Sequence, residues 1–459
     1  MGLEHDAPET EDADPFDAFR QFFALERDVL VLSAAMFAFS LGFQMTSRYM
    51  GEYMYALGAS AFVVGLFGTF GNVISAIYPY PGGAISDRLG SRYALTVFGL
   101  CSTIGFGIWL AAPALEGISA GPIPLEIAAI FVGLVFAQAW KSFGLGATFA
   151  IVKQSVPPSQ LAAGFASTET FRRTAFLVGP LFAAALFFPF GSTDSDVVFA
   201  FQLILVVAVV FGVVGTLVQH FRYDVEEDSF GTEFAGVEQV LADLRAMPTE
   251  LRPLLVGDTL VRFANGMVYV FFVIVVTRFH EVGLSLSVPT VGPVDLSPQS
   301  YFGVLLGLEM LVALLVMVPA AKAAERVGLK PVVALGFAVY AVFPIVLINA
   351  PESAAVLAAL FAFSGLRFAG LPAHKALIVG PAERGTGGRV TGTYYLLRNV
   401  IVVPSAALGG LLWGGVSNPL TGTQLFAGDP ALAFAIATAI GLVGTGYFLV
   451  FGKEFEAYR

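Results

Sequence analysis

The chain has 459 residues, of which 57% are hydrophobic and only 13% are charged, about half the charged fraction of a soluble globular domain. Its net charge is −10, and the acids are concentrated in residues 4–17 and 224–250, which argues against nucleic-acid binding. A single cysteine excludes an intrachain disulfide and the four histidines lack metal-ligand spacing, so we expect neither a metal site nor a cofactor. This composition predicts an integral membrane protein.

The apolar runs along the chain predict its helices. Residues 1–27 are acidic and lack the basic start and apolar centre of a signal peptide, so we expect a cytoplasmic tail there. An apolar run of roughly 20 residues crosses the membrane as a helix. Twelve such runs follow, at 28–49, 61–81, 93–112, 123–152, 162–190, 197–220, 254–278, 300–321, 331–350, 353–380, 390–416 and 430–451. They predict an all-α integral membrane protein with twelve transmembrane helices.

A repeated motif divides the chain into two halves. Residues 83–92 read GAISDRLGSR, and residues 321–330 read AKAAERVGLK. The offset of 238 residues preserves charge sign or glycine at four pairs of positions: Asp87 and Glu325, Arg88 and Arg326, Gly90 and Gly328, Arg92 and Lys330. We predict two pseudo-symmetric six-helix bundles, residues 28–220 and 253–452. A cytoplasmic linker with an amphipathic helix joins them at 221–252, and residues 453–459 form a second tail.

The distribution of basic residues predicts the topology. Sixteen lysines and arginines flank one face of the predicted bundle, whereas only Arg48 and Arg278 flank the other. Cytoplasmic loops carry an excess of basic residues, and an even number of spans leaves both termini on one side. We therefore expect a multi-pass protein of the cytoplasmic membrane with both termini in the cytoplasm.

Nine ionisable residues fall inside the apolar runs: Lys141, Glu169, Arg172, Arg173, Asp258, Arg262, Glu309, Arg367 and Arg398. Each costs roughly 2.5–3.5 kcal/mol at a helix centre, so such residues normally face a partner or a water-filled cavity. Counting from the cytoplasmic turns at about 1.5 Å per residue places five of them near the bilayer middle. These five are Lys141, Arg172, Glu309, Arg367 and Arg398. The nine residues are our candidates for substrate binding and coupling.

Some of these residues also have a purely structural interpretation. Asp258 with Arg262, and Glu169 with Arg172 or Arg173, have the spacing of intrahelical ion pairs. His374 is expected in a loop network near the cytoplasmic end. Other residues are interpreted as packing groups, namely Gly65, Gly68, Gly71, Trp140, Tyr394 and Tyr395.

The first motif resembles the signature of the major facilitator superfamily, G-x-L-a-D-R-x-G-R-[RK], between its second and third spans. Gly83, Asp87, Arg88, Gly90 and Arg92 match, while Ile85 stands for the leucine and Ser91 replaces one basic residue. A degenerate second copy is also a family feature, and the resemblance covers nearly the whole chain. Gly179 and Pro180 more weakly resemble the end of an antiporter-type motif.

This resemblance implies an arrangement of the spans. Spans 1, 4, 7 and 10 would line a central cavity, with span 5 against span 8 and span 2 against span 11. Lys141 and Arg367 would then face the cavity, and Glu309 would face Arg172 or Arg173. The two motifs would form a cytoplasmic gate, in which Asp87 and Glu325 approach the N-terminal ends of facing helices.

The functional hypothesis is a monomeric secondary transporter that moves a small molecule by alternating access. Proton coupling would use Glu309 or Glu169, and the positive cavity favours an anionic substrate. The partial antiporter motif and apolar lining favour the alternative of a lipophilic-compound efflux antiporter. A non-transporting sensor or receptor with the same fold is the alternative of another class. The sequence has no phosphate-binding loop and no paired catalytic motif, so neither ATP-driven transport nor an enzyme is predicted.

Overall fold

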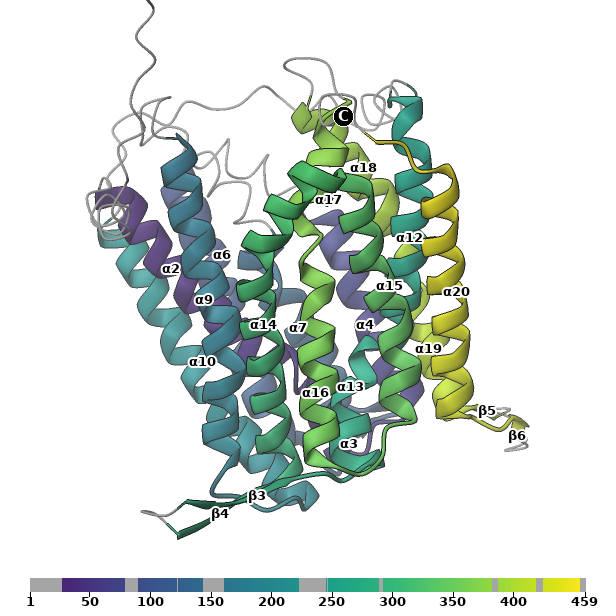
Figure 1. Ribbon diagram of the computed structural model, residues 1–459. Helices are drawn as coiled ribbons and strands as arrows, with labels where there is room; N and C mark the ends of the chain where they lie inside the picture. Colours follow the sequence, from purple (N-terminus) through teal and green to yellow (C-terminus); the bar gives the residue numbers. More distant parts are fainter. Residues whose placement is uncertain are drawn as a thin grey trace, which may run out of the picture.

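The computed structural model describes residues 27–78, 90–121, 123–142, 161–222, 245, 247–288, 292–381, 387–417 and 424–454. Its helices stand roughly parallel in a single layered bundle, with the C-terminus at the upper end and β3 to β6 at the lower end (Figure 1). In the described residues, ten helices are long and apolar enough to cross a membrane. The chain is therefore a multi-pass membrane protein.

In the first part of the chain, the described residues of each predicted apolar run are mainly helical. Its helices are α2 (Arg27–Ser47), α3 (Met50–Ala56), α4 (Ala61–Ile77), α6 (Ser91–Ala111), α7 (Leu125–Ala137), α9 (Leu161–Phe187) and α10 (Asp194–Arg222). A 3-10 turn (Ala112–Leu115) and the strands β1 (Ser119–Ala120) and β2 (Ile123–Pro124) connect α6 to α7. Helix α3 was not predicted, and it lengthens the first helical run at the lower end of the molecule.

The second part follows the same pattern with more interruptions. Its helices are α12 (Arg252–Val268), α13 (Phe272–Ile274), α14 (Pro298–Val327), α15 (Leu329–Ile348), α16 (Ala354–Gly365), α17 (Leu371–Val379), α18 (Gly387–Val402), α19 (Ser405–Gly414) and α20 (Pro430–Phe451). Antiparallel hairpins pair β3 (Leu284–Val288) with β4 (Gly292–Leu296), and β5 (Val416–Ser417) with β6 (Gln424–Phe426). The predicted linker helix lies mostly in residues 223–244, outside the described part of the chain.

Local chemistry sets several helix starts. Ser60 accepts a hydrogen bond from the Val63 amide, and Ser297 accepts one from the Ser300 amide. Asp429 accepts from the amides of Ala431 and Leu432. Each side chain thereby satisfies a backbone donor that has no partner inside its helix. Large apolar side chains such as Leu315 and Val450 remain exposed at 65% and 71%, as expected for a surface in contact with lipid.

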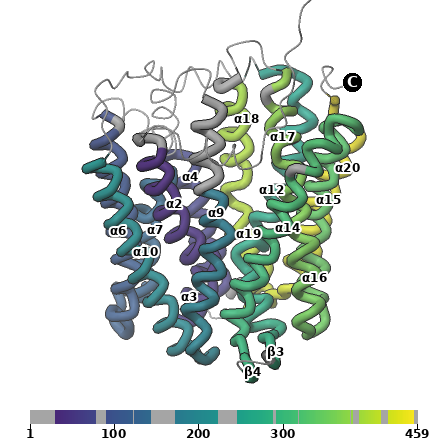
Figure 2. The backbone as a smooth tube through the Cα atoms, turned by 60° about the vertical axis from the view of Figure 1, so that its left-hand side comes forward, coloured from purple at the N-terminus to yellow at the C-terminus, as the bar shows by residue number. Residues whose placement is uncertain are grey.

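Small residues allow close packing of helices distant in sequence. Helix α4 packs on α19, and α9 packs on α14. Figure 2 shows the purple-to-teal helices of the first part on the left and the green-to-yellow helices of the second part on the right. A methyl group on Gly65 would meet the backbone oxygen of Ala406, and one on Gly68 would meet the Ala406 side chain. The packing interpretation of Gly65 and Gly68 is thus confirmed, and so are the contacts of span 2 with span 11 and of span 5 with span 8.

Gly65→Ala is expected to destabilise the protein by about 1–3 kcal/mol, because α4 and α19 must move apart to admit the methyl group. The matched control is Gly107→Ala in α6, where an added methyl group meets no atom within 4 Å. The control is expected to be neutral or slightly stabilising, because alanine favours helices over glycine. Thermal unfolding in detergent measures both variants, and equal melting temperatures would contradict the packing.

Candidate functional site

The lower end of the molecule is closed by hydrogen bonds around one carboxylate, that of Glu52 in α3. Glu52 is fully buried, and it accepts hydrogen bonds from the Thr277 hydroxyl at 2.8 Å, the Arg278 Nε at 3.1 Å and the Gln299 amide at 3.1 Å. Arg278 also donates to Asp194 at 2.7 Å. We call these five residues the Glu52 network.

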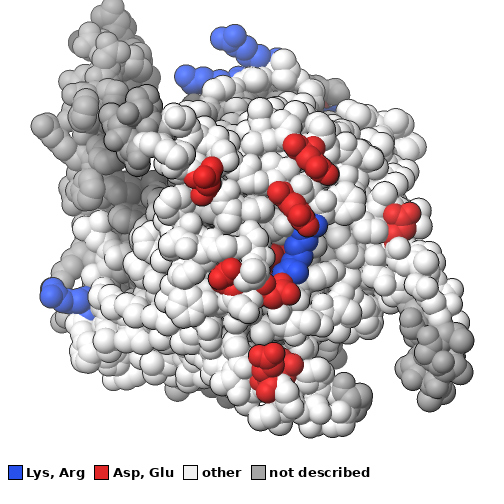
Figure 3. Space-filling view, turned by 90° about the horizontal axis from the view of Figure 1, so that it is seen from below, with Lys and Arg blue, Asp and Glu red and all other residues white. Residues whose placement is uncertain are grey.

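The Glu52 network joins the two parts of the chain. Its carboxylates come from the part before residue 223, and its donors come from the part after residue 245. Tyr49 adds a hydrogen bond from its hydroxyl to the Gln299 carbonyl at 2.9 Å. Figure 3 shows this end from below, where acidic side chains predominate around one basic patch. The burial of Glu52 did not follow from the sequence, because residue 52 lies between two predicted apolar runs.

Above this network lies a cavity of about 220 Å³, which we call the first lobe. Its charged lining residues are Arg48, Lys141, Glu309 and Arg367. Aromatic and polar side chains complete the wall, among them Phe67, Asn72, Ser75, Gln138, Tyr269, Phe272 and Phe302. These residues come from predicted spans 1, 4, 7 and 10, as the family resemblance implied, and also from α4 and α14.

Two breaks in helical structure shape the cavity wall. The α12 helix ends at Val268 and is followed by a 3-10 turn, Tyr269–Phe271, and by a π-helical turn, Val275–Phe279. A second 3-10 turn, Leu366–Phe368, separates α16 from α17 and carries Arg367. Irregular backbone at membrane depth is tolerated where it lines a cavity, and both breaks contribute residues to this one.

A buried ion pair connects α14 to the second break. Arg367 Nη2 lies 2.6 Å from Glu309 Oε1, and the side chains are only 3% and 4% exposed. The Ser364 hydroxyl donates to the same oxygen at 2.5 Å. The expectation that Glu309 faces Arg172 or Arg173 was wrong, because the nearer guanidinium belongs to Arg367.

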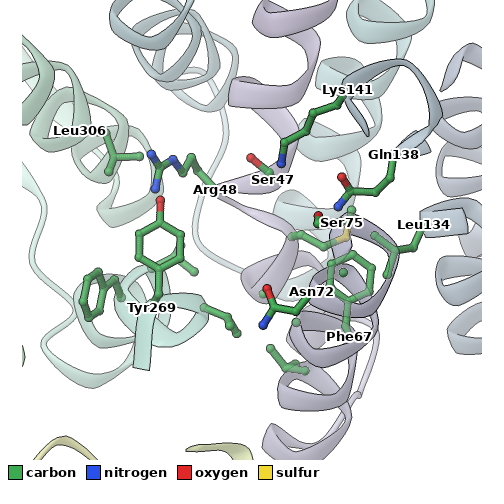
Figure 4. A pocket seen from close by; sticks show the side chains of 18 of the residues that line it. Ser47, Arg48, Phe67, Asn72, Ser75, Leu134, Gln138, Lys141, Tyr269 and Leu306 are labelled. Carbon is green, nitrogen blue, oxygen red and sulfur yellow. The ribbon is translucent and has the colours of Figure 1, made fainter. Parts of the chain in front are cut away.

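Arg48 is a site residue that the sequence analysis missed. It follows the last residue of α2, and its guanidinium lies 4.9 Å from the centre of the Tyr269 ring. Figure 4 shows Arg48 and Lys141 reaching into the cavity from different segments, with Ser47 between them. Counting Arg48 among the residues of the outer face was wrong. The continuation of the apolar sequence through residues 50–56 was the signal that could have placed it inside.

Lys141 occupies the predicted cavity position. It follows α7 in a helical turn, and its ammonium lies 5.7 Å from the Phe43 ring centre. Among the described residues, neither Lys141 nor Arg48 has a carboxylate within 4 Å, whereas Arg278 and Arg367 do. The first lobe therefore has three cationic side chains against the carboxylate of Glu309.

Asp258 organises a second charged cluster. Its buried carboxylate lies 3.3 Å from Arg262 Nε and 3.1 Å from Arg398 Nη1, and it accepts a hydrogen bond from the Tyr394 hydroxyl at 3.1 Å. The predicted intrahelical pair with Arg262 is present, but it is one of several interactions. The interpretation of Tyr394 as a packing residue was therefore incomplete, whereas Trp140 does stack on Phe39 at 4.5 Å.

His374 also belongs to this cluster. It lies in α17, is 4% exposed, and its Nε2 is 3.2 Å from Asp258 Oδ2. The expectation of a loop position was wrong, because the helix resumes after the 3-10 turn and carries the imidazole inward.

The Asp258 cluster borders a second cavity of about 260 Å³, the second lobe. Arg262 and Arg398 line it with Asn72, Asn265 and Asn399. The two lobes share Gly68, Asn72, Tyr269 and Val270 as lining residues. Tyr340 links the two charged clusters, because both Arg262 and Arg367 lie over its ring, at 4.8 Å and 5.0 Å from the centre.

The other membrane charges lie elsewhere. Arg172 is partly buried, with its guanidinium 5.5 Å from the Phe176 ring centre, and both Arg172 and Arg173 have further interaction partners. The Glu169 side chain lies outside the described part of the structure. Neither lobe includes any of these three residues among its described lining.

The repeated motif is described only in part. Gly83, Asp87 and Arg88 lie outside the described residues, so the gate that they were predicted to form stays a prediction. Gly90 and Gly328 have φ of 83° and 92° and precede the first residues of α6 and α15. Their equivalent conformations agree with the repeat, since positive φ favours glycine.

The second motif is described, but the residues before the facing helix α9 are not, so the gating role of Glu325 stays a prediction. Glu325 and Arg326 are exposed, whereas Arg92 and Lys330 are partly buried. The carboxylate that reaches a helix start belongs to Glu454, which accepts from the amides of Leu329 at 3.0 Å and Lys330 at 2.9 Å. An acidic group at a helix N-terminus is favourable, and here the segment after α20 supplies it.

No cluster of three or more histidine, cysteine or acidic side chains that could hold a metal occurs in the described residues. The site is instead a cavity inside a multi-pass helical protein, walled by cationic, aromatic and amide side chains. This combination of fold and site defines a membrane transporter.

The sequence model of the Major Facilitator Superfamily matches residues 30–398, so the chain belongs to this family. A comparison with curated proteins finds no match. Among solved structures, the D323A mutant of the nucleoside transporter NupG is similar with a TM-score of 0.69 at 13% identity, covering 93% of this chain and 100% of that one. These findings indicate a transporter and not an enzyme.

Two further solved structures share the fold. A bacterial homologue of the iron transporter ferroportin, in its inward-facing state, has a TM-score of 0.69 at 13% identity, covering 93% of this chain and 99% of that one. A POT family transporter in complex with 5-aminolevulinic acid has a TM-score of 0.67 at 13% identity, covering 94% and 99%. Such low identities relate the folds and leave the substrate to be argued from the cavity.

Proposed function

We propose that the protein is a secondary active transporter that moves a small anion across the cytoplasmic membrane by alternating access. It would have twelve spans in two six-helix bundles, residues 28–220 and 253–452, with both termini cytoplasmic. The observation that carries the proposal is the first lobe, where Arg48, Lys141 and Arg367 face one carboxylate. Because unpaired charge inside a membrane is costly, an anionic substrate would compensate the excess.

The Glu52 network at the lower end and the position of the lobes above it support alternating access. The Glu52 network closes the lower end, and the lobes lie between that network and the end at which the C-terminus lies. Transport would require the network to separate while the substrate occupies the cavity. The buried Glu309–Arg367 pair supports coupling to protons, because protonation of Glu309 would release Arg367 for the substrate.

Uptake into proteoliposomes tests the proposal. A panel of small organic anions, neutral solutes and lipophilic cations should show saturable flux only for anions. Lys141→Gln is expected to lower kcat/KM for the transported anion at least about tenfold, since one charge-assisted contact is lost. Lys141→Arg should retain most of the flux, and Arg252→Gln, at an exposed position, serves as the control.

The other outcomes decide between the alternatives. Flux of lipophilic cations would support the efflux antiporter and overturn the anion proposal. Anion binding without flux, in vesicles where a known transporter is active, would support a sensor or receptor. Normal anion flux in the Lys141→Gln variant would contradict the proposal that the substrate binds in the first lobe.

A further inference from the structure

Among the described residues, positive charge is in excess in both lobes of the cavity. In the first lobe, Arg48, Lys141 and Arg367 face the carboxylate of Glu309. In the second lobe, Arg262 and Arg398 share the carboxylate of Asp258. The positive charge of the second lobe is accessible to a ligand, because the Arg262 and Arg398 side chains remain 25% and 17% exposed and line the lobe.

The two lobes are neighbouring cavities that share part of their lining. They meet at Asn72 and Tyr269, which line both, and Figure 4 shows these two side chains facing each other across the opening from α4 and from the turn after α12. Arg262 of the second lobe and Arg367 of the first lie 4.8 Å and 5.0 Å from the centre of the same Tyr340 ring. Cationic groups of the two lobes therefore lie within the reach of a short carbon chain.

The residues that line the boundary between the two lobes are uncharged. Asn72 and Tyr269 offer amide and hydroxyl groups, while Gly68 and Val270 form apolar wall. Asn265 adds a buried carbonyl oxygen without a hydrogen-bond partner among the described residues. A ligand that matches this pattern is anionic at both ends and uncharged between them.

We infer that the substrate is a linear organic dianion, with one acidic group at Arg48 and Lys141 and the other at Arg262 and Arg398. This inference rests on the proposed function and specifies its substrate class. A monoanion would fill one lobe and leave the charge of the other uncompensated. The dianion compensates both, so the second acidic group contributes affinity as well as specificity.

Isothermal titration calorimetry on the purified full chain tests this inference. The ligands are α,ω-dicarboxylates from succinate to pimelate, each paired with the monocarboxylate of the same chain length. At least one dicarboxylate is expected to bind about tenfold or more tightly than its paired monocarboxylate, with one ligand per protein. Equal affinities at every length, or two monocarboxylates bound per protein, would overturn the inference.

A variant locates the second acidic group. Arg398→Gln is expected to reduce the dicarboxylate affinity about tenfold, toward that of the paired monocarboxylate. Arg398→Lys keeps the charge and should restore part of the preference, which a merely structural role for Arg398 would not do. If Arg398→Gln does not fold, the comparison of paired ligands on the unmodified protein still decides the inference.

The experiment separates this inference from the proposed function. Anion flux without any preference for dicarboxylates would support the proposed anion transporter and contradict a dianionic substrate. Absence of binding and flux for every anion would remove both.

Discussion

Replacing Arg367 with glutamine is expected to lower the free energy of unfolding by about 3–5 kcal/mol and to abolish transport. The change leaves the buried Glu309 carboxylate without its charged partner at 2.6 Å. The Ser364 hydroxyl remains as one donor and cannot compensate a full charge. Thermal unfolding in detergent and anion flux in proteoliposomes measure the two effects.

A double variant distinguishes the effect of the ion pair on stability from the effect of Arg367 on transport. Glu309→Gln with Arg367→Gln removes both charges, so stability should return while flux remains absent. Arg252→Gln, an exposed arginine at the start of α12, is the control and should change neither measurement. An Arg367→Gln protein that unfolds like the unmodified protein would contradict a buried pair at this position.

Glu309→Gln alone examines the coupling hypothesis. The neutral side chain cannot release a proton, so flux driven by a pH gradient should stop while exchange of substrate across the membrane continues. Unchanged response to the pH gradient would exclude Glu309 as the coupling group and leave Glu169 as the remaining candidate from the sequence.

Glu52→Gln is expected to weaken closure of the lower end by about 2–5 kcal/mol, since the Arg278 guanidinium loses a buried carboxylate. A loss of about 3 kcal/mol changes the ratio of closed to open molecules roughly a hundredfold. The pair lies between the two parts of the chain, so the variant should favour opening at the lower end and leave the fold intact.

Cysteine labelling measures this change. Ser47→Cys places a thiol in the first lobe, in a Cys101→Ser background that has no other cysteine. A membrane-impermeant maleimide applied from the β3–β4 side should react slowly with this protein and at least tenfold faster once Glu52→Gln is added. Glu116→Gln, an exposed acid in the turn after α6, is the control, and equal rates in both variants would remove the closing role of Glu52.

Much of the fold followed from the sequence because hydropathy is a local property. A membrane-crossing helix needs a long apolar run whatever its neighbours are, and every described α-helix except α3 overlaps a predicted run. The paired glycines Gly90 and Gly328 were also predictable, because the repeat preserves them and both adopt positive φ. The helical break at residues 269–271 was not, since no proline or charge run marks it. The break at 366–368 is followed by Gly370 and Pro372, which interrupt helices, so this break had a signal in the sequence.

The sequence by itself determined that this is a membrane protein, which charges lie within its apolar runs and which residues repeat. Every such charge carries a cost in lipid, so its mere presence indicated a buried partner or a cavity. The choice of partner was decided only by tertiary structure. Glu309 pairs with Arg367, Arg398 joins Asp258, and Glu52 is buried against Arg278. These pairings depend on how helices distant in sequence pack together and on where the helices are interrupted. The hydropathy of the chain predicts neither the packing nor the interruptions.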